Sequence, residues 1–205
     1  MDFSQNQKEK KTIYSPPYDS PIEDELIWHL TKYINPVIEV VPQFEIVTTR
    51  ANYRLDFALE IEGKLIGIEC DGKDYHNLRR DIWRDVEIIN NSQIEEIFRF
   101  RGCDIYYHIN ECLYVLGWLH KGLFDNRGFD NLKRLVEGEV FQDSFLEEIY
   151  GLTYIDLDFK GFNGEFNLIK VVKSSRKFSQ FNYYSNVLLD NPLSSIDFIF
   201  EKYNT

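Results

Sequence analysis

The sequence predicts an α/β protein in which helices flank a mixed central sheet. Apolar residues recur at helical spacing after Ser20 and again after Tyr75, while segments rich in β-branched and aromatic residues lie between and beyond these stretches. A Glu62-Gly63 pair between two of these segments is typical of a tight hairpin turn. The resulting order of helix, three strands, helix, strand and helix fits an α/β core within residues 20–122.

Length and composition fit one domain with an appendage. The chain has 205 residues, of which 43% are hydrophobic and 16% aromatic, so it can bury a core of ordinary size. No apolar run approaches the roughly 20 residues of a membrane helix, and the polar residues 1–11 lack the apolar stretch of a signal peptide. We therefore expect a soluble cytoplasmic protein without a membrane partner. The odd number of cysteines disfavours a disulfide framework.

The first helix has clear start and stop signals. Residues 1–19 are predicted to form a flexible N-terminal arm. Ser20 is a good helix cap, Pro21 suits the first helical position, and Glu23 completes a capping box. The apolar stripe runs to about Ile34, and Asn35-Pro36 ends the helix.

The later elements follow from changes in hydrophobic period. Residues 37–47 predict a strand, with a break at Pro42 left open. The further expected elements of the core are strands over 53–60 and 64–71, a helix from about Tyr75 to Asn90-Asn91, a strand over 94–100 followed by an Arg101-Gly102 turn, and a helix over 111–120. Residues 123–205 form an extension of open role, in which Asn163-Gly164 predicts a hairpin within 152–173.

The predicted hairpin places acids where apolar strands do not favour them. A two-residue turn at Glu62-Gly63 sets Asp56 directly opposite Glu69, and Asp71 shares the face of Glu69 because side chains alternate along a strand. Opposed side chains on one face lie about 5 Å apart, where like charges are destabilising. The three acids therefore predict a bound cation.

A series of seven motifs resembles the small endonuclease-like family called domain of unknown function 559, which is related to the very-short-patch-repair endonucleases of the PD-(D/E)XK, or restriction-endonuclease-like, superfamily. The resemblance covers roughly residues 20–120, and the motifs occur in the expected order. They are Ser20-Pro-Ile-Glu23, Gln43-Phe-Glu, Tyr53-Arg-Leu-Asp-Phe-Ala, Ile68-Glu-Cys-Asp-Gly, Tyr75-His76, Arg84-Asp85 and Phe98-Arg-Phe-Arg-Gly.

The resemblance implies a metal-dependent phosphodiesterase core. Its helix acid matches Glu23, its first-strand Asp matches Asp56, and the acid of its (D/E)XK element matches Glu69. The position of the Lys that usually follows is occupied by Asp71 here, so the role of that Lys is unassigned. Either Lys73 replaces it, or the metal-bound water needs no lysine.

The chemistry of these residues fits phosphodiester hydrolysis. Mg²⁺ (or Mn²⁺) prefers hard oxygen ligands, which Asp56 and Glu69 supply, and it activates bound water. Asp71 is predicted as a further ligand or an outer base, and Glu23 as a second-site ligand or water-orienting group. His76 is predicted to act as an acid, a base or a phosphate contact. We expect the partner to be nucleic acid, and DNA in particular. The residues expected to contact it are Lys73, Arg79, Arg80 and Arg84.

Structural alternatives stand beside these predictions. The strand acids could form a solvated face, Glu23 could serve the helix cap alone, and His76 could pack beside the helix that follows it. The net charge of −11 argues against a protein that coats nucleic acid nonspecifically. A non-catalytic binding or regulatory module on a nuclease fold, and an acidic mimic of DNA, are therefore the rivals of a nuclease. The sequence predicts no oligomeric state.

Overall fold

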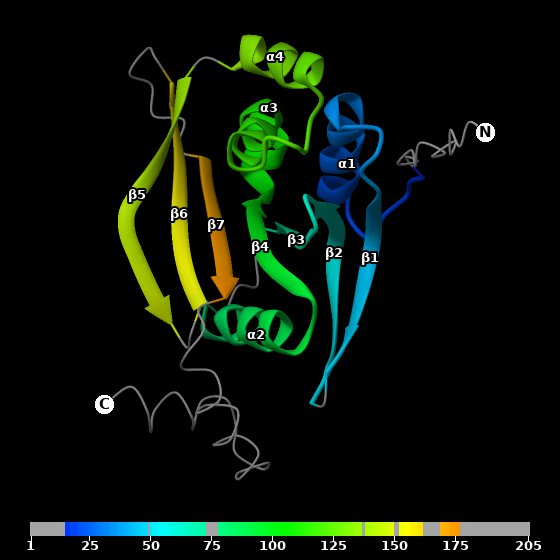
Figure 1. Ribbon diagram of the computed structural model, residues 1–205, viewed down its shortest axis with the longest axis vertical. Coiled ribbons are helices and arrows are strands. Elements are labelled where there is room, and N and C mark those ends of the chain that lie inside the picture. The colour runs from blue at the N-terminus through cyan, green and yellow to red at the C-terminus, as the bar shows by residue number, and fades with distance from the viewer. Residues whose placement is uncertain are drawn as a thin grey trace, which may run out of the picture.

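The structure is a computed structural model that describes residues 15–48, 50–72, 78–136, 138–149, 152–161 and 169–176, with side chains described for 15–48, 50–72, 81 and 83–136. Its described strands form one mixed sheet in the order β1-β2-β3-β4-β7-β6-β5 (Figure 1). The strands are β1 (Val40–Val47), β2 (Asn52–Ile61), β3 (Lys64–Asp71), β4 (Ile94–Arg101), β5 (Gly138–Ile149), β6 (Leu152–Gly161) and β7 (Ile169–Arg176). Neighbouring strands are antiparallel except β3 and β4, which are parallel.

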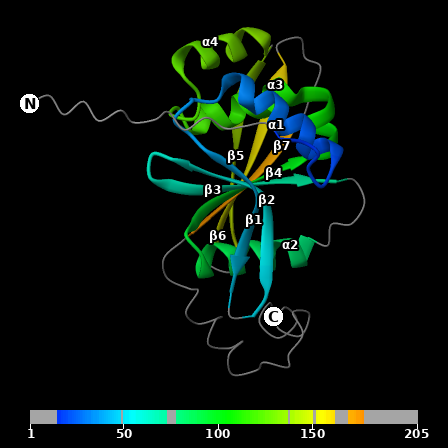
Figure 2. The ribbon, with the colours of Figure 1, turned by 90° about the vertical axis from the view of Figure 1, so that its right-hand side faces the viewer.

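Helices cover both faces of this sheet. The helices are α1 (Pro21–Tyr33), α2 (Leu78–Asn91), α3 (Gly102–Leu119) and α4 (Asn126–Leu135). Helices α1, α3 and α4 lie together on one face, and α2 lies on the other (Figure 2). The predicted α/β class, a mixed sheet flanked by helices, is confirmed. None of the described helices has the length and apolar character that crossing a membrane requires.

The start of α1 follows its sequence signals. Ser20 has extended backbone angles and is the N-cap, and Pro21 occupies the first turn. The Ser20 hydroxyl accepts a hydrogen bond from the Glu23 N–H at 3.4 Å and donates one to Glu23 Oε1 at 2.7 Å. The cap therefore fixes the Glu23 side chain at the beginning of the helix.

The β2–β3 hairpin has the predicted register. Ile61 pairs with Lys64 and Phe57 with Ile68, so Glu62 and Gly63 alone form the turn. Both turn residues have positive φ, 53° and 81°, as a two-residue hairpin turn requires. This register places Asp56 and Glu69 at the next opposed position after Phe57 and Ile68.

The parallel pairing of β3 with β4 needs a crossover, which α2 supplies. Val86 and Ile89 of α2 are fully buried, as the predicted helical stripe requires. In the resulting register Glu69 is the partner of Arg99, and Asp71 is the partner of Arg101. The crossover therefore brings basic residues of β4 beside the acids of β3.

Several boundaries differ from the sequence-based expectations. The predicted Arg101-Gly102 turn is wrong, because α3 begins at Gly102. The segment before residue 111, which the sequence left unassigned, is helical apart from a kink at His108, whose backbone angles are not helical. A side chain at Gly102 would come within 3.3 Å of the Asp71 carbonyl oxygen and of Ile22, so glycine permits this close approach. Strand β1 begins at Val40 and continues through Pro42, which an edge strand tolerates.

The C-terminal extension joins the same sheet. Strands β6 and β7 pair antiparallel, which confirms the predicted strand pairing, while the expected Asn163-Gly164 turn lies outside the described residues. Strand β7 pairs with β4, and β5 adds a further antiparallel strand beside β6. Helix α4 and strand β5 have no counterpart in the sequence-based prediction.

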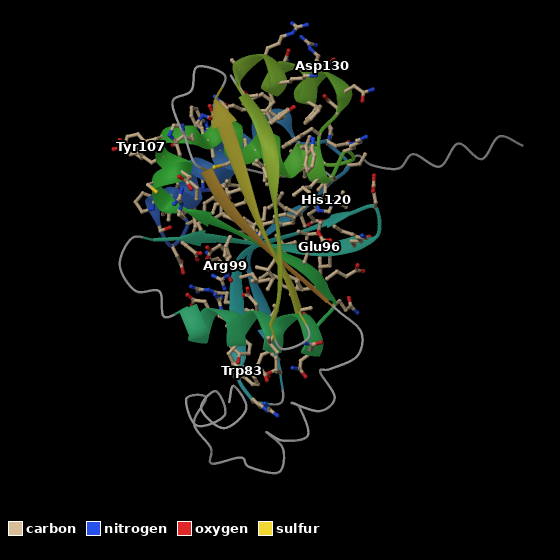
Figure 3. The ribbon with its side chains drawn as sticks, turned by 90° about the vertical axis from the view of Figure 1, so that its left-hand side faces the viewer. Trp83, Glu96, Arg99, Tyr107, His120 and Asp130 are labelled. Carbon is tan, nitrogen blue, oxygen red and sulfur yellow. The ribbon has the colours of Figure 1, made fainter. Side chains whose placement is uncertain are left out.

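The main core lies between the sheet and helices α1 and α3. Its largest fully buried side chains are Phe57, Phe98, Phe100, Leu26, Ile27, Leu30, Leu59, Ile66 and Ile68. On β4, Glu96 faces His120 at the end of α3, and the two side chains form a buried pair at 3.0 Å (Figure 3). These contacts fix β3 and β4 against the helices, so the acids at the end of β3 stand on a rigid support.

Candidate functional site

Asp56 is held against strand β3 by its own carboxylate. The regular β2–β3 pairing ends at Phe57 and Ile68, and Asp56 Oδ2 accepts the next backbone hydrogen bond, from the Cys70 N–H at 2.7 Å. A side-chain oxygen thus takes the place of a backbone acceptor on β2. This contact fixes Asp56 beside Glu69, the residue before Cys70.

The Asp56 carboxyl resists ionisation. Burial is the largest cause and raises its pKa from 3.8 to about 6, against the lowering effect of the Cys70 hydrogen bond. The charges of Glu23 and Asp71 raise the pKa further, while Arg84 lowers it. These interactions show that Asp56 lies close enough to Glu23 and Asp71 for their charges to act on it.

Glu69 is the most deeply buried of the strand acids, with 5% of its surface exposed. Burial raises its pKa from 4.5 to about 8, although Arg84 and Arg99 act in the opposite direction. Arg84 Nη2 lies 2.7 Å from Glu69 Oε1. The two groups form an ion pair, so Arg84 is the described partner of this buried oxygen.

Arg84 reaches two elements from α2. Besides its ion pair with Glu69 on β3, its guanidinium donates a hydrogen bond to the backbone carbonyl of Arg54 on β2. The Arg84 side chain retains 28% of its exposure. It therefore lies at the surface end of the site with its charge directed inward.

Asp71 belongs to a second charged group, centred on Arg99. Arg99 Nη1 donates to Asp71 Oδ1 at 3.0 Å, and its Nε and Nη2 bind both oxygens of Asp85 at 3.3 and 2.7 Å. Arg99 and Asp85 are both buried, and Arg99 lies between the sheet and α2 (Figure 3). The two aspartates raise the already high pKa of Arg99, so the guanidinium stays charged.

Glu23 is buried and bound on three sides. Its Oε1 accepts the hydrogen bond from the Ser20 hydroxyl. Its Oε2 accepts hydrogen bonds from the Asp19 N–H at 3.3 Å and from Gln43 Nε2 at 2.7 Å. Gln43 has a φ of 51°, an uncommon value for a residue with a side chain. This backbone conformation accompanies an amide that reaches from β1 to α1.

The structure brings most of the predicted acids together. Glu23, Asp56, Glu69 and Asp71 gather around the end of β3. The charges of Glu23 and Asp71 raise the pKa of Asp56, and the charge of Asp56 raises the pKa of Glu69. Within the described residues, no group of three or more His, Cys, Asp or Glu side chains is arranged to hold a metal ion. The predicted three-carboxylate ligand set therefore stays a prediction, and Asp71 is directed to Arg99.

The predicted basic residues have different outcomes. Arg84 turns toward Glu69, whereas it was expected to contact nucleic acid. Arg79 and Arg80 lie in the first turn of α2, but only their backbone is among the described residues. Lys73 and His76 lie outside the described residues. Their predicted roles stay predictions.

Sequence reasoning gave no individual role to Arg99 and Asp85, and it favoured a structural role for Gln43. Arg99 and Asp85 form the buried charge pair of this site, and Gln43 holds the helix acid. The motifs Gln43-Phe-Glu, Arg84-Asp85 and Phe98-Arg-Phe-Arg contain all three. A further signal was present on β4, where Arg99 stands between Phe98 and Phe100 in an apolar segment.

The donor set fits one hard divalent cation with few protein ligands. Asp56 and Glu69 are neighbouring carboxylates whose pKa values are raised chiefly by burial, and the buried Glu69 Oε1 has a positive partner in Arg84. Mg²⁺ commonly binds through one or two carboxylates together with water and substrate phosphates. Comparison with protein-family models, with curated proteins and with solved structures gives no match for this chain.

Proposed function

We propose that the protein is a metal-dependent nuclease with a restriction-endonuclease-like core, which hydrolyses phosphodiester bonds in nucleic acid, with DNA as the expected substrate. The observation that carries the proposal is the juxtaposition of two carboxylates, that of the half-buried Asp56 and that of the buried Glu69. The ordered series of motifs on residues 20–120 supports the same conclusion.

Each carboxylate has a distinct part in the proposed site. Asp56 and Glu69 would hold Mg²⁺ or Mn²⁺, which when bound would polarise the phosphoryl group and lower the pKa of its bound water. The Cys70 N–H fixes one oxygen of Asp56, so the carboxylate is oriented before a ligand arrives. Glu23 is oriented by Ser20 and Gln43 at the border of the site, where it can orient a water molecule.

Arg99 supplies a permanent positive charge beside these acids. It binds Asp71 directly and lies next to Glu69 across the β3–β4 pair. Because Asp85 fixes it in place, its charge cannot follow the substrate, and its part is to hold Asp71 and to offset the repulsion among the acids. Asp71 is then an outer acceptor near the site.

Cleavage of plasmid and of labelled oligonucleotides in Mg²⁺ or Mn²⁺ tests this proposal. We expect Asp56→Asn to reduce cleavage to background while the unfolding transition is retained, because the substitution keeps the shape and removes the charge. Asp130→Ala, in the exposed part of α4, is the control and should cleave as the wild type does (Figure 3). Undiminished cleavage by Asp56→Asn, or in excess EDTA, would contradict the mechanism.

A non-catalytic binding module is the second candidate, favoured by one specific observation. Glu69 and Asp71 already have arginine partners, so the acids can be accommodated without an added cation. Isothermal titration with Mn²⁺ separates the two candidates. Oligonucleotide binding without Mn²⁺ uptake supports the module, whereas uptake that depends on Asp56 supports the nuclease.

A further inference from the structure

Arg84 and a divalent cation would compete for one carboxylate. The Arg84 guanidinium lies 2.7 Å from Glu69 Oε1, and Glu69 is a ligand of the proposed metal site. Two positive groups on one buried carboxylate repel each other strongly at such short range. The approach of a cation to Glu69 therefore weakens the ion pair of Arg84.

The two arginines of the site differ in their freedom to leave. Arg99 is 7% exposed and is bound to Asp85 through two hydrogen bonds, so its displacement would leave buried charges without partners. Arg84 keeps 28% of its side-chain exposure, and its other described contact is a backbone carbonyl. Withdrawal of Arg84 into water is therefore the less costly movement.

We propose that Arg84 is an exchangeable counter-ion of Glu69, which neutralises the carboxylate before a divalent cation enters and is displaced from it by that cation. The inference rests on the proposed function, because it takes Glu69 as a metal ligand. Displacement frees a guanidinium at the border of the site, in a position to meet an anionic phosphate. The exchange reconciles the ion pair of Arg84 with the nucleic-acid contact that the sequence predicts for it.

Side-chain NMR of the full chain tests the exchange without reference to activity. The Arg84 Nε–Hε signal, assigned by its loss in Arg84→Lys, should shift or broaden as Mg²⁺ is added, while the signal of exposed Arg127 on α4 keeps its position as an internal control. The Cys70 amide signal reports binding at Asp56 independently. The same titration of Asp56→Asn should leave all three signals unchanged.

Affinity provides the second measurement. Removal of a competitor should tighten binding where Glu69 is ionised in both proteins, so at such a pH Arg84→Met should bind Mn²⁺ about tenfold more tightly than the wild type, a coupling of ordinary size. The matched control is Arg50→Met, which breaks a comparable ion pair of 3.0 Å with buried Glu87 on the same helix and should leave the affinity unchanged.

The outcomes separate this inference from the proposed function. If the Cys70 signal responds to Mg²⁺ but the Arg84 signal does not, the exchange is overturned and the metal site stands. Equal or weaker Mn²⁺ binding by Arg84→Met also overturns the exchange. If neither signal responds and no ion binds, both the exchange and the metal-dependent function are overturned.

Discussion

Glu69 shows how a single carboxyl group acquires unusual properties in this fold. Its strand position and the packing of α2 bury the carboxyl, which disfavours the charged form and raises the pKa. The charges of Arg84 and Arg99 lower the pKa but only partly offset the effect of burial. Asp56 experiences the same conflict to a smaller degree, because the Cys70 N–H stabilises its charge. Both residues are therefore predisposed to bind a proton or a cation.

The raised pKa of Glu69 predicts that stability falls as pH rises. A carboxyl whose pKa increases from 4.5 to about 8 on folding binds more protons in the folded state between these values, so the stabilisation present below pH 4.5 is lost as pH approaches 8. Denaturant titrations in EDTA from pH 5 to 9 should show this decrease in the free energy of unfolding. Glu69→Gln should flatten the curve, and exposed Glu60→Gln should not. A wild-type stability independent of pH would contradict the prediction.

At the scale of elements, charge contacts complement apolar packing in joining α2 to the sheet. Asp85 of α2 binds Arg99 of β4, which binds Asp71 of β3, so one guanidinium connects three elements. Arg84 makes a similar connection from α2 to β3 and β2. The position of α2 therefore determines which acids have a counter-charge.

Removal of Asp85 should destabilise the protein strongly. Asp85→Ala removes the carboxylate that binds the buried Arg99 through both oxygens. Loss of one member of a buried ion pair typically lowers the free energy of unfolding by about 3–5 kcal/mol. Chemical denaturation measures the loss. The control is Asp19→Ala, which breaks a half-exposed pair with Arg54 and should cost less than about 1 kcal/mol. Similar losses for the two variants would show that Arg99 finds another partner.

At the scale of the molecule, the C-terminal extension completes the sheet. Strand β4 lies between β3 and β7, so its edge is protected by a segment more than 60 residues away in the chain. Strands β5 and β6 follow on the far side of β7. The acids of the site thus depend on a sheet whose continuity involves both halves of the sequence.

A chain that ends at residue 136 should be less stable and prone to self-association. It would expose the backbone donors and acceptors of β4 that β7 covers, and unpaired edges favour pairing between molecules. Size-exclusion chromatography and thermal unfolding, compared with the full chain, measure both effects. A monodisperse shortened chain with an unchanged unfolding midpoint would show that β4 does not need β7.

Much of the fold and part of the site could be predicted from local sequence. The Ser20 cap, the Glu62-Gly63 turn and the helical stripe of α2 depend on neighbouring residues, and the structure contains each of them. The start of α3 could not be predicted, since Gly102 appears as a turn residue until Ile22 and the Asp71 carbonyl are seen beside it. Strand β5 is likewise stabilised by pairing with β6 rather than by a strong local pattern.

The opposition of Asp56 and Glu69 follows from local sequence, because a two-residue turn fixes the register of an antiparallel hairpin. The partners of these acids follow from the packing of the whole fold. Arg84 and Arg99 approach them across the parallel β3–β4 pair and its crossover helix, whose placement depends on core packing rather than on sequence spacing. The location of the negative charge is therefore a local property, whereas its neutralisation is a property of the folded chain.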